Sequence, residues 1–227
     1  MKKGYQGLYN VIFKRLLDIL VSALVLILFG WLLGLLALAV RIKMGSPVIF
    51  CQERPGRIDP KTGKERMFRL YKFRSMTDAR DERGNLLPAS QRLTRFGRRL
   101  RATSLDELPE FWNILKGDMS LIGPRPLWAN YLEYYNEFEH RRHLVRPGLT
   151  GLAQVNGRNA TSWGKRFEYD NEYVRNVSLA LDVKILLATV KQVLKHENVE
   201  FEKDHQPILD YFADPDRTKN AEGGEED

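Results

Sequence analysis

One long apolar segment sets the main limit on what this chain can fold into. Residues 19–40 contain no charged side chain over 22 positions. As an α-helix this segment would be about 33 Å long, close to the thickness of the hydrocarbon core of a lipid bilayer. Hydrophobic residues make up 43% of the whole chain and charged residues 29%, values typical of soluble proteins. The sequence therefore predicts one membrane-embedded helix joined to a water-soluble domain, and it excludes wholesale disorder and a multi-span transporter.

Three topologies are open for this helix. It could be a cleaved signal peptide, with the cleavage-like triplet Ala37-Leu38-Ala39, although the apolar run is longer than a typical signal core. It could also span the membrane as a simple anchor. Basic side chains flank it on both sides, however, so the charge bias that orients a spanning helix is missing. Equal flanks favour a re-entrant helix that enters and leaves on one face of the membrane, and Gly30 offers a point at which it can bend.

The charge of the chain is basic and unevenly distributed. Lys and Arg total 36 against 29 Asp and Glu, which gives a net charge of +7. Residues 214–227 hold six acids and two bases, a net −4, so the 213 residues before them carry +11. A domain this basic is expected to act on an anionic partner, which could be a phosphorylated metabolite, a nucleic acid or an anionic membrane. The single cysteine, Cys51, and four scattered histidines predict no zinc site.

Local patterns predict several elements after the apolar helix. Strands at residues 48–52 and 67–76 flank a turn-forming stretch at 59–63, an arrangement typical of a β-hairpin. Arginines and regularly spaced apolar residues predict a basic helix over residues 92–101, for which a solvated face and a binding face are equally good explanations. Residues 179–196 have the pattern of an amphipathic helix.

Two further segments complete this division of the chain. Aromatic and charged residues alternate through residues 127–143, which predicts a helix whose aromatic stripe either packs into the core or lies at a membrane interface. Beyond residue 200 the composition turns polar, and we expect a disordered tail. The predicted parts are thus a membrane-associated helix with its flanks at residues 1–45, the main domain at 46–200 and a tail at 201–227.

Two adjacent carboxylates, Asp106 and Glu107, directly follow the basic helix. One explanation is purely structural: Ser104 and Glu107 have the spacing of a helix capping box, in which their side chains bind free backbone amides. Pro109 opposes that explanation, since it would delete a backbone hydrogen bond inside the helix; a later start near Pro109 would place both carboxylates at the helix mouth. Either start puts them where the helix dipole is positive, which favours ionised carboxylates and the approach of phosphate oxygens.

These two carboxylates suggest a division of labour, because neighbours on a helix point about 100° apart. One carboxylate can attack phosphorus and form an acyl phosphate, while the other holds a metal ion. Mg²⁺ is the expected ion, since it prefers one or two carboxylates plus substrate phosphate oxygens. Arg101 and Arg125 are the best-placed guanidinium donors to the phosphoryl oxygens. Arg125 lies between Pro124 and Pro126, which present it rigidly or serve only as a structural turn.

A series of short motifs follows the apolar helix in a defined order. Together with that helix, the series resembles the bacterial sugar transferase family and, more narrowly, its small monotopic phosphoglycosyl transferases. The resemblance runs from about Lys14 to about Asn198. The motifs are Lys72-Phe73-Arg74-Ser75-Met76, Ser104-Leu105-Asp106-Glu107-Leu108-Pro109, Gly117-Asp118-Met119-Ser120, Gly123-Pro124-Arg125-Pro126-Leu127, Arg146-Pro147-Gly148-Leu149-Thr150-Gly151 and Gln154-Val155-Asn156-Gly157-Arg158.

The resemblance implies an activity and the residues that perform it. Members of the family transfer a sugar phosphate from a nucleotide sugar, usually a UDP-sugar, to a polyprenyl phosphate such as undecaprenyl phosphate, and release UMP. It implies that Asp106 is the nucleophile of a covalent phosphosugar intermediate and that Glu107 coordinates Mg²⁺. The substrate-binding residues that it implies are Arg101, Arg125, Lys72, Arg74, Pro124, Arg146, Gln154, Asn156 and Arg158.

The resemblance also implies a fold and a place in the cell. The expected fold is α+β and mostly helical, with a re-entrant membrane helix, a short hairpin and amphipathic interfacial helices around a small catalytic domain. That domain would lie on the cytoplasmic face of the bacterial inner membrane. Relatives often carry Ser-Pro at the middle of the membrane helix, where this chain has Gly30-Trp31.

The expected partners are a UDP-sugar, a polyprenyl phosphate and membrane lipid, with no nucleic acid. A membrane-tethered nucleic-acid-binding protein is the alternative, in which the arginine helix would contact the phosphate backbone. The sequence leaves open which sugar is transferred, which glycoconjugate pathway is served, and the oligomeric state, a homodimer included.

Overall fold

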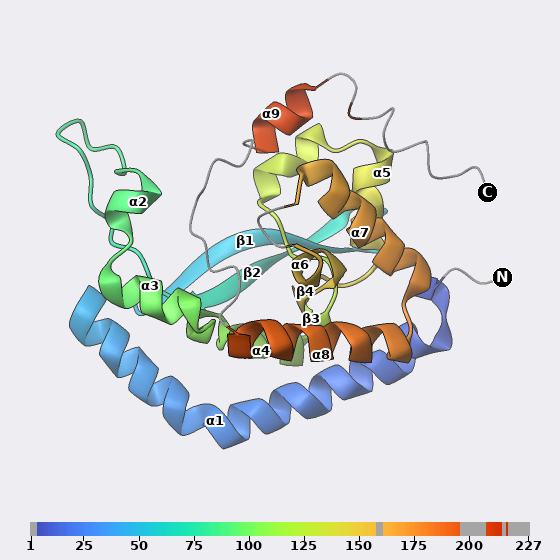
Figure 1. Cartoon of the computed structure of the whole chain (residues 1–227), viewed down its shortest axis with the longest axis horizontal. Helices are drawn as coiled ribbons and strands as arrows, with labels where there is room; N and C mark the ends of the chain where they lie inside the picture. The colour runs from blue at the N-terminus through green and yellow to red at the C-terminus, as the bar shows by residue number, and fades with distance from the viewer. Residues whose placement is uncertain (1–3, 158–160, 196–207, 215–216, 218–227) are drawn as a thin grey trace.

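A long bent helix lies beneath two small sheets and a set of shorter helices in the computed structural model of the chain (Figure 1). The structure describes residues 4–157, 161–195, 208–214 and 217. In chain order the elements are η1 Gly4–Gln6, η2 Tyr9–Phe13, α1 Lys14–Met44, β1 Ile49–Ile58, β2 Glu65–Phe73, α2 Ala89–Arg92, α3 Arg95–Ala102, η3 Leu105–Glu107, α4 Glu110–Lys116, β3 Ser120–Ile122, η4 Ala129–Tyr134, α5 Glu137–His140, η5 Arg141–Leu144, β4 Gly148–Thr150, α6 Leu152–Val155, α7 Trp163–Asn176, α8 Leu179–Lys195 and α9 Ile208–Ala213. The mostly helical α+β class is confirmed.

The predicted hairpin is present and longer than expected. β1 and β2 pair antiparallel from Ile49 opposite Phe73 to Pro55 opposite Met67, and a second pairing follows a shift in register. The turn-forming stretch at residues 59–63 connects them, and Gly63 supplies the left-handed backbone with a φ of 68°. Because side chains alternate across a strand, one face of the hairpin packs into the core and presents polar side chains at its end.

A second sheet was not predicted. β3 and β4 are three-residue strands that pair in parallel, with Ser120 opposite Gly148 and Ile122 opposite Thr150. Their backbones approach so closely that a Cβ atom on Gly148 would lie 2.0 Å from the backbone nitrogen of Gly123. Glycine is therefore required at this position. The sheet fixes the loop that follows β3, which contains Arg125.

The N-terminal end of α1 is tied to the domain by buried polar contacts. Asp182 of α8 accepts hydrogen bonds from the Lys14 ammonium group, from Tyr9 Oη at 2.7 Å and from Tyr173 Oη at 2.7 Å. One turn further along α1, Asp18 Oδ1 accepts the hydroxyl of Ser120 at 3.1 Å. These polar side chains are partnered inside the protein, so this end of α1 belongs to the folded domain.

The C-terminal end of α1 packs against the same domain. Val40 and Met44 are buried together with Phe73 of β2 and Leu100 of α3. Between its two ends α1 presents mainly apolar side chains outward, and only 6% of its most apolar 18-residue window is buried. The helix formed by Tyr9–Met44 is long and apolar enough to cross a membrane. Helix α1 is thus apolar and exposed along its middle and is attached to one domain at both ends.

Helix α8 forms where the amphipathic pattern predicted it, but its apolar face is not in the core. Six of its apolar side chains are exposed, namely Leu179, Val183, Leu186, Leu187, Val190 and Val193. Ile185 on the opposite side is buried in the core. Figure 1 shows α8 above α1, and Lys14 joins the two helices through Asp182. An exposed apolar face of this extent is typical of a surface that meets a partner or a membrane.

The single helix predicted over residues 127–143 is wrong. This segment forms three short pieces, η4, α5 and η5, and Asn136 caps α5 through a capping box with Glu139. Tyr131, Tyr135 and Phe138 pack in a core cluster, where Tyr135 lies edge-on against Phe167 of α7, while Trp128 and Tyr134 are exposed. Core packing, one of the two explanations of the aromatic stripe, is thus confirmed for these three residues.

The expectation of disorder beyond residue 200 is wrong for one segment. Ile208–Ala213 forms α9, whose Ile208 and Phe212 are buried against η4 and α7. The pattern of apolar residues there is too short to stand out from its polar surroundings, and only the aromatic cluster it packs on makes the helix stable. The acidic end at residues 218–227 and the stretch at 201–207 lie outside the described residues, and the predicted boundaries at 45 and 200 stay predictions.

Replacing Asp182 by asparagine is expected to destabilise the protein by about 3 kcal/mol, because the Lys14 charge would then be buried without a counter-charge. The measurement is the free energy of unfolding by urea in detergent. Asp210→Asn is the matched control, since Asp210 is exposed on α9 and should change stability by less than about 0.5 kcal/mol. Equal stability of the two variants would contradict the role given to Asp182.

Candidate active site

The two adjacent carboxylates occupy a tight turn between two helices. Helix α3 ends at Ala102, and Ser104 then adopts a left-handed conformation with a φ of 55°. Asp106 and Glu107 lie in the short turn η3, and α4 begins only at Glu110. The capping-box explanation is therefore wrong, because the Ser104 side chain makes no capping hydrogen bond. The later helix start is confirmed, and both carboxylates lie at the mouth of α4.

Glu107 is the centre of a small ionic cluster. Its Oε1 accepts a hydrogen bond from Lys72 Nζ at 2.8 Å and another from Arg125 at 2.8 Å. Lys72 also lies 2.9 Å from Oε1 of Glu110, whose side chain is 3% exposed. Three segments far apart in the sequence thus meet here: the end of β2, the turn η3 and the loop after β3. The predicted grouping of Lys72, Arg125 and Glu107 is present.

Asp106 lies beside this cluster and is only 7% exposed. Burial and the charge of Glu107 raise its pKa to about 6, although the positive charges of Lys72, Arg101 and Arg125 oppose the rise. The pKa of Glu107 moves the other way. Burial alone would raise it, but Arg125 and Lys72 outweigh burial and hold it below its usual range. The two adjacent carboxylates therefore have different environments, which is the condition for different roles.

Two charged side chains beside this cluster, one on the hairpin and one on α4, are absent from the sequence predictions. Arg54 lies on the same side of the hairpin as Lys72, since the register pairs it with Phe68. Burial and the charge of Arg125 lower the pKa of Arg54 to about 10. Glu110 is the second, and burial together with the charge of Glu107 raises its pKa. Arg54 can be recognised only from the register of the hairpin, whereas Glu110 directly follows the Ser104–Pro109 motif in the sequence.

Arg101 and Arg74 have partners of their own. Arg101 comes from the last turn of α3, donates to Ser75 Oγ at 2.9 Å, and acts on the pKa of Asp106. Arg74 follows β2 and is held by Ser46 O at 2.7 Å and by Asp78 at 3.1 Å. Arg101 thus belongs to the charged surroundings of Asp106, while the contacts of Arg74 lead away from the carboxylates.

The remaining predicted residues are spread around the fold. Pro124 is buried next to Arg125. Arg146 donates to Gly117 O at 3.1 Å, and the charges that act on it are those of Arg15, Arg57 and Asp18 instead of the carboxylate pair. The side-chain amide of Gln154 is buried and has no hydrogen-bond partner among the described residues, and the exposed Asn156 donates to Leu152 O. Arg158 lies outside the described residues. Roles for these last residues stay predictions.

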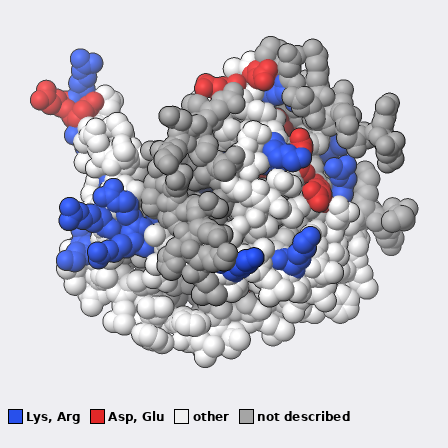
Figure 2. All heavy atoms as spheres, viewed as in Figure 1, with Lys and Arg blue, Asp and Glu red and all other residues white. Residues whose placement is uncertain are grey.

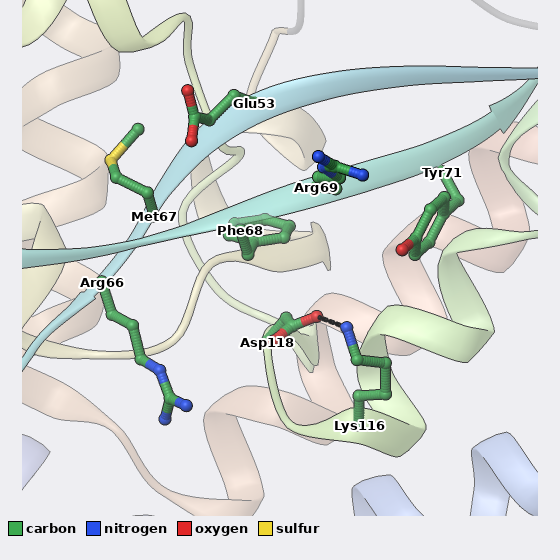
Figure 3. A pocket seen from close by; sticks show the side chains of 8 residues that line it. All are labelled: Glu53, Arg66, Met67, Phe68, Arg69, Tyr71, Lys116 and Asp118. Carbon is green, nitrogen blue, oxygen red and sulfur yellow. Dashed lines mark hydrogen bonds and ion pairs between the residues drawn. The ribbon is translucent and has the colours of Figure 1, made fainter.

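A separate hollow of about 320 Å³ lies on the outer side of the hairpin (Figure 3). Figure 3 shows Lys116 and Asp118 paired at its edge, with Arg66 and Arg69 reaching it from β2. Neither carboxylate of the pair lines it, so it is distinct from the ionic cluster. A surface of basic side chains also covers α3, where Arg95, Arg98 and Arg99 are exposed (Figure 2).

Comparison with known protein families identifies the family of the chain that carries this cluster. The model of the bacterial sugar transferase family matches residues 9–196, which include α1, both sheets and the carboxylate pair. The chain belongs to the bacterial sugar transferase family.

Three relatives of this sugar transferase are similar over most of its length, and the names of two of them state a reaction. The uncharacterized sugar transferase EpsL of Bacillus subtilis (strain 168) is 52% identical to this chain over 190 residues. The match covers 84% of this chain and 91% of EpsL. Another, the UDP-glucose:undecaprenyl-phosphate glucose-1-phosphate transferase of Klebsiella pneumoniae, is 45% identical over 80% of this chain and 40% of its own length. The UDP-N-acetylgalactosamine-undecaprenyl-phosphate N-acetylgalactosaminephosphotransferase of Aeromonas hydrophila is 38% identical over 80% of this chain and 43% of its own length. The chain therefore spans about two fifths of the length of these two relatives.

The carboxylate pair of this sugar transferase has too few ligands to hold a metal ion through protein side chains alone, but enough for Mg²⁺ that also binds substrate phosphates. The described residues contain no group of three or more His, Cys, Asp or Glu side chains that could hold a metal ion. The hydrogen bonds and ion pairs that these residues make to Glu107 go to Oε1, which leaves Oε2 available to a cation. A site with one or two carboxylates is sufficient for Mg²⁺ when substrate phosphates complete the coordination.

Proposed function

We propose that this transferase moves a sugar phosphate from a UDP-sugar to undecaprenyl phosphate and releases UMP. The observation that carries the proposal is the pair Asp106 and Glu107 at the centre of Lys72, Arg101 and Arg125. Three cations around two carboxylates suit a diphosphate that must be held while one of its phosphorus atoms is attacked. The names of the Klebsiella and Aeromonas relatives support the two substrates.

The proposed reaction has two displacements at the same phosphorus atom. An oxygen of Asp106 bonds to the phosphorus that bears the sugar, and the bond from this phosphorus to the bridging oxygen breaks, so that UMP leaves with the electron pair. An oxygen of undecaprenyl phosphate then bonds to that phosphorus, and the carboxylate of Asp106 leaves. The buried environment of Asp106 supports this role, because water competes poorly for the acyl phosphate in such a site.

The cations have separate tasks in this scheme. Arg125, whose side chain is 46% exposed, is the cation of the cluster most open to an incoming phosphate. Lys72 is shared between Glu107 and Glu110, and its charge also favours the ionised form of Asp106. Arg101 balances charge on Asp106 from the α3 side. Glu107 would hold Mg²⁺ through Oε2, and the bound ion would supply positive charge to the donor diphosphate.

We propose that the enzyme is inserted in one leaflet of the bacterial inner membrane with its catalytic domain on the cytoplasmic side. Support comes from α1, whose two ends contact the same domain while its middle is exposed and apolar. A straight crossing would separate those ends by the whole bilayer, whereas the bent, re-entrant helix keeps both on one face (Figure 1). The exposed apolar face of α8 would lie in the interface of that leaflet.

Cysteine labelling is expected to place both flanks of α1 on the same side of the membrane. Cys51 is exposed just after α1, and Gln6 is exposed before it, so the native protein and Gln6→Cys in a Cys51→Ser background report the two flanks separately. A membrane-impermeant maleimide should label both in inside-out vesicles and neither in intact spheroplasts. A thiol engineered into the known periplasmic side of a control protein verifies the orientation of each preparation. Labelling of the two positions from opposite sides would contradict re-entry.

A further inference from the structure

An exposed aromatic side chain lies just beyond the ionic cluster and has no role in the reaction described so far. Trp128 follows Arg125 by three residues, and the indole is 49% exposed. Its ring stacks on Tyr131, with ring centroids 6.0 Å apart and planes 8° from parallel. Tyr131 is anchored in turn against Phe212 of α9. The indole is therefore half exposed, and Tyr131 supports it by stacking.

Arg54 connects this aromatic face to the cluster. Its guanidinium carbon lies 5.7 Å from the centroid of the Trp128 ring. One of its nitrogens donates to Pro126 O at 3.2 Å and another to Gln52 Oε1 at 2.6 Å, so the group is fixed in place. Pro126 directly follows Arg125, so the hydrogen bond to Pro126 O places Arg54 beside the segment that carries Arg125. Cations thus continue from Glu107 through Arg125 and Arg54 to the aromatic face.

A membrane anchor is a poor explanation for this aromatic pair. Tyr131 packs with α9, and Figure 1 shows α9 on the side of the hairpin away from α1. A purely structural role for Trp128 does not explain why about half of the indole surface is exposed. Aromatic side chains beside cations are the arrangement that binds a nucleobase next to its phosphates, since every base has a π face that can stack.

We propose that Trp128 stacks on the nucleobase of the donor nucleotide, with Arg54 holding the indole beside the diphosphate site. The inference rests on the proposed function, because that function supplies the sugar nucleotide. Three residues of extended chain span at most about 10 Å, so Arg125 and Trp128 are near enough for one nucleotide to contact both. The base would lie on the side of the cluster opposite to the membrane, which leaves the membrane side of Asp106 to the lipid phosphate.

The test compares nucleotide binding with binding of a ligand that has no base. Trp128→Ala in the full-length protein should weaken binding of UMP and UDP about tenfold or more, by loss of stacking, and leave the dissociation constant of inorganic pyrophosphate unchanged. Trp128→Phe should recover most of the nucleotide affinity, because a phenyl ring also stacks. In turnover, Trp128→Ala should raise KM for the UDP-sugar and leave kcat and the KM for undecaprenyl phosphate nearly unchanged.

Trp163→Ala is the matched control, since Trp163 packs into the same aromatic cluster through Phe167 and its loss tests the stability of that cluster alone. Unchanged UMP affinity in Trp128→Ala would overturn the inference, as would an equal loss of pyrophosphate affinity or an equal loss in Trp163→Ala. Failure of the proposed function is visible separately. In that case the unaltered protein itself would form no sugar-phosphate adduct with any UDP-sugar.

Discussion

Asp106→Asn is expected to abolish formation of the sugar-phosphate adduct and to lower turnover by about 10³-fold or more. The asparagine amide has nearly the shape of the carboxylate but cannot act as the nucleophile. Intact-mass measurement after mixing with Mg²⁺ and a panel of UDP-sugars should show the adduct in the unaltered protein and none in the variant. UMP release on addition of undecaprenyl phosphate should fall in parallel.

Because Asp106 is buried among charges, its replacement needs a control for folding. Removing its negative charge next to Glu107 relieves repulsion, so the variant should fold at least as stably as the unaltered protein. Asp78→Asn changes an exposed carboxylate that pairs with Arg74, away from the carboxylate pair, and it should keep the adduct. An adduct that persists in Asp106→Asn would move the nucleophile to a neighbouring acid, with Glu107 and Glu110 the nearest candidates.

The features that sequence predicted well are those with a long local period. The 22 uncharged positions of the apolar run, the turn formers between the two strands of the hairpin and the apolar spacing of α8 are each long enough to outweigh chance. Shorter elements are not predicted, because they lack such a local signal. The three-residue strands β3 and β4 carry no period of their own and exist only because segments 28 positions apart pair. Helix α9 likewise depends on aromatic side chains far away in the sequence.

The site shows a similar division. Asp106, Glu107, Lys72 and Arg125 were found through ordered motifs, although Lys72 and Glu107 are 35 positions apart and nothing local joins them. The spacing of Ser104 and Glu107 leaves a capping box and a later helix start both open, because spacing alone does not reveal the left-handed backbone of Ser104. Arg54 was missed because its position beside the cluster follows from the register of β1 on β2, which no local pattern reports.

Glu107→Gln is expected to slow adduct formation by about 10²-fold or more and to raise the Mg²⁺ concentration needed for half-maximal rate by at least about tenfold. The amide keeps the size of the side chain but loses the charge that pairs with Lys72 and Arg125 and that would bind the ion. The rate of adduct formation is measured by quenched-flow mass spectrometry over a Mg²⁺ titration, with a chelator-treated sample at zero.

The Mg²⁺ titration separates the two parts of this role, because Glu110 shares Lys72 but is buried behind it. Glu110→Gln removes the negative charge of the second carboxylate that pairs with Lys72, so the rate of adduct formation can change through the position of Lys72. The Mg²⁺ dependence of this variant should match that of the unaltered protein. A rightward shift of the titration in Glu107→Gln alone assigns the ion to Glu107. Equal titration curves in all three proteins would instead make Glu107 an electrostatic partner that positions Arg125 and Lys72, and the metal would then have to be held by Asp106 or by the donor phosphates alone.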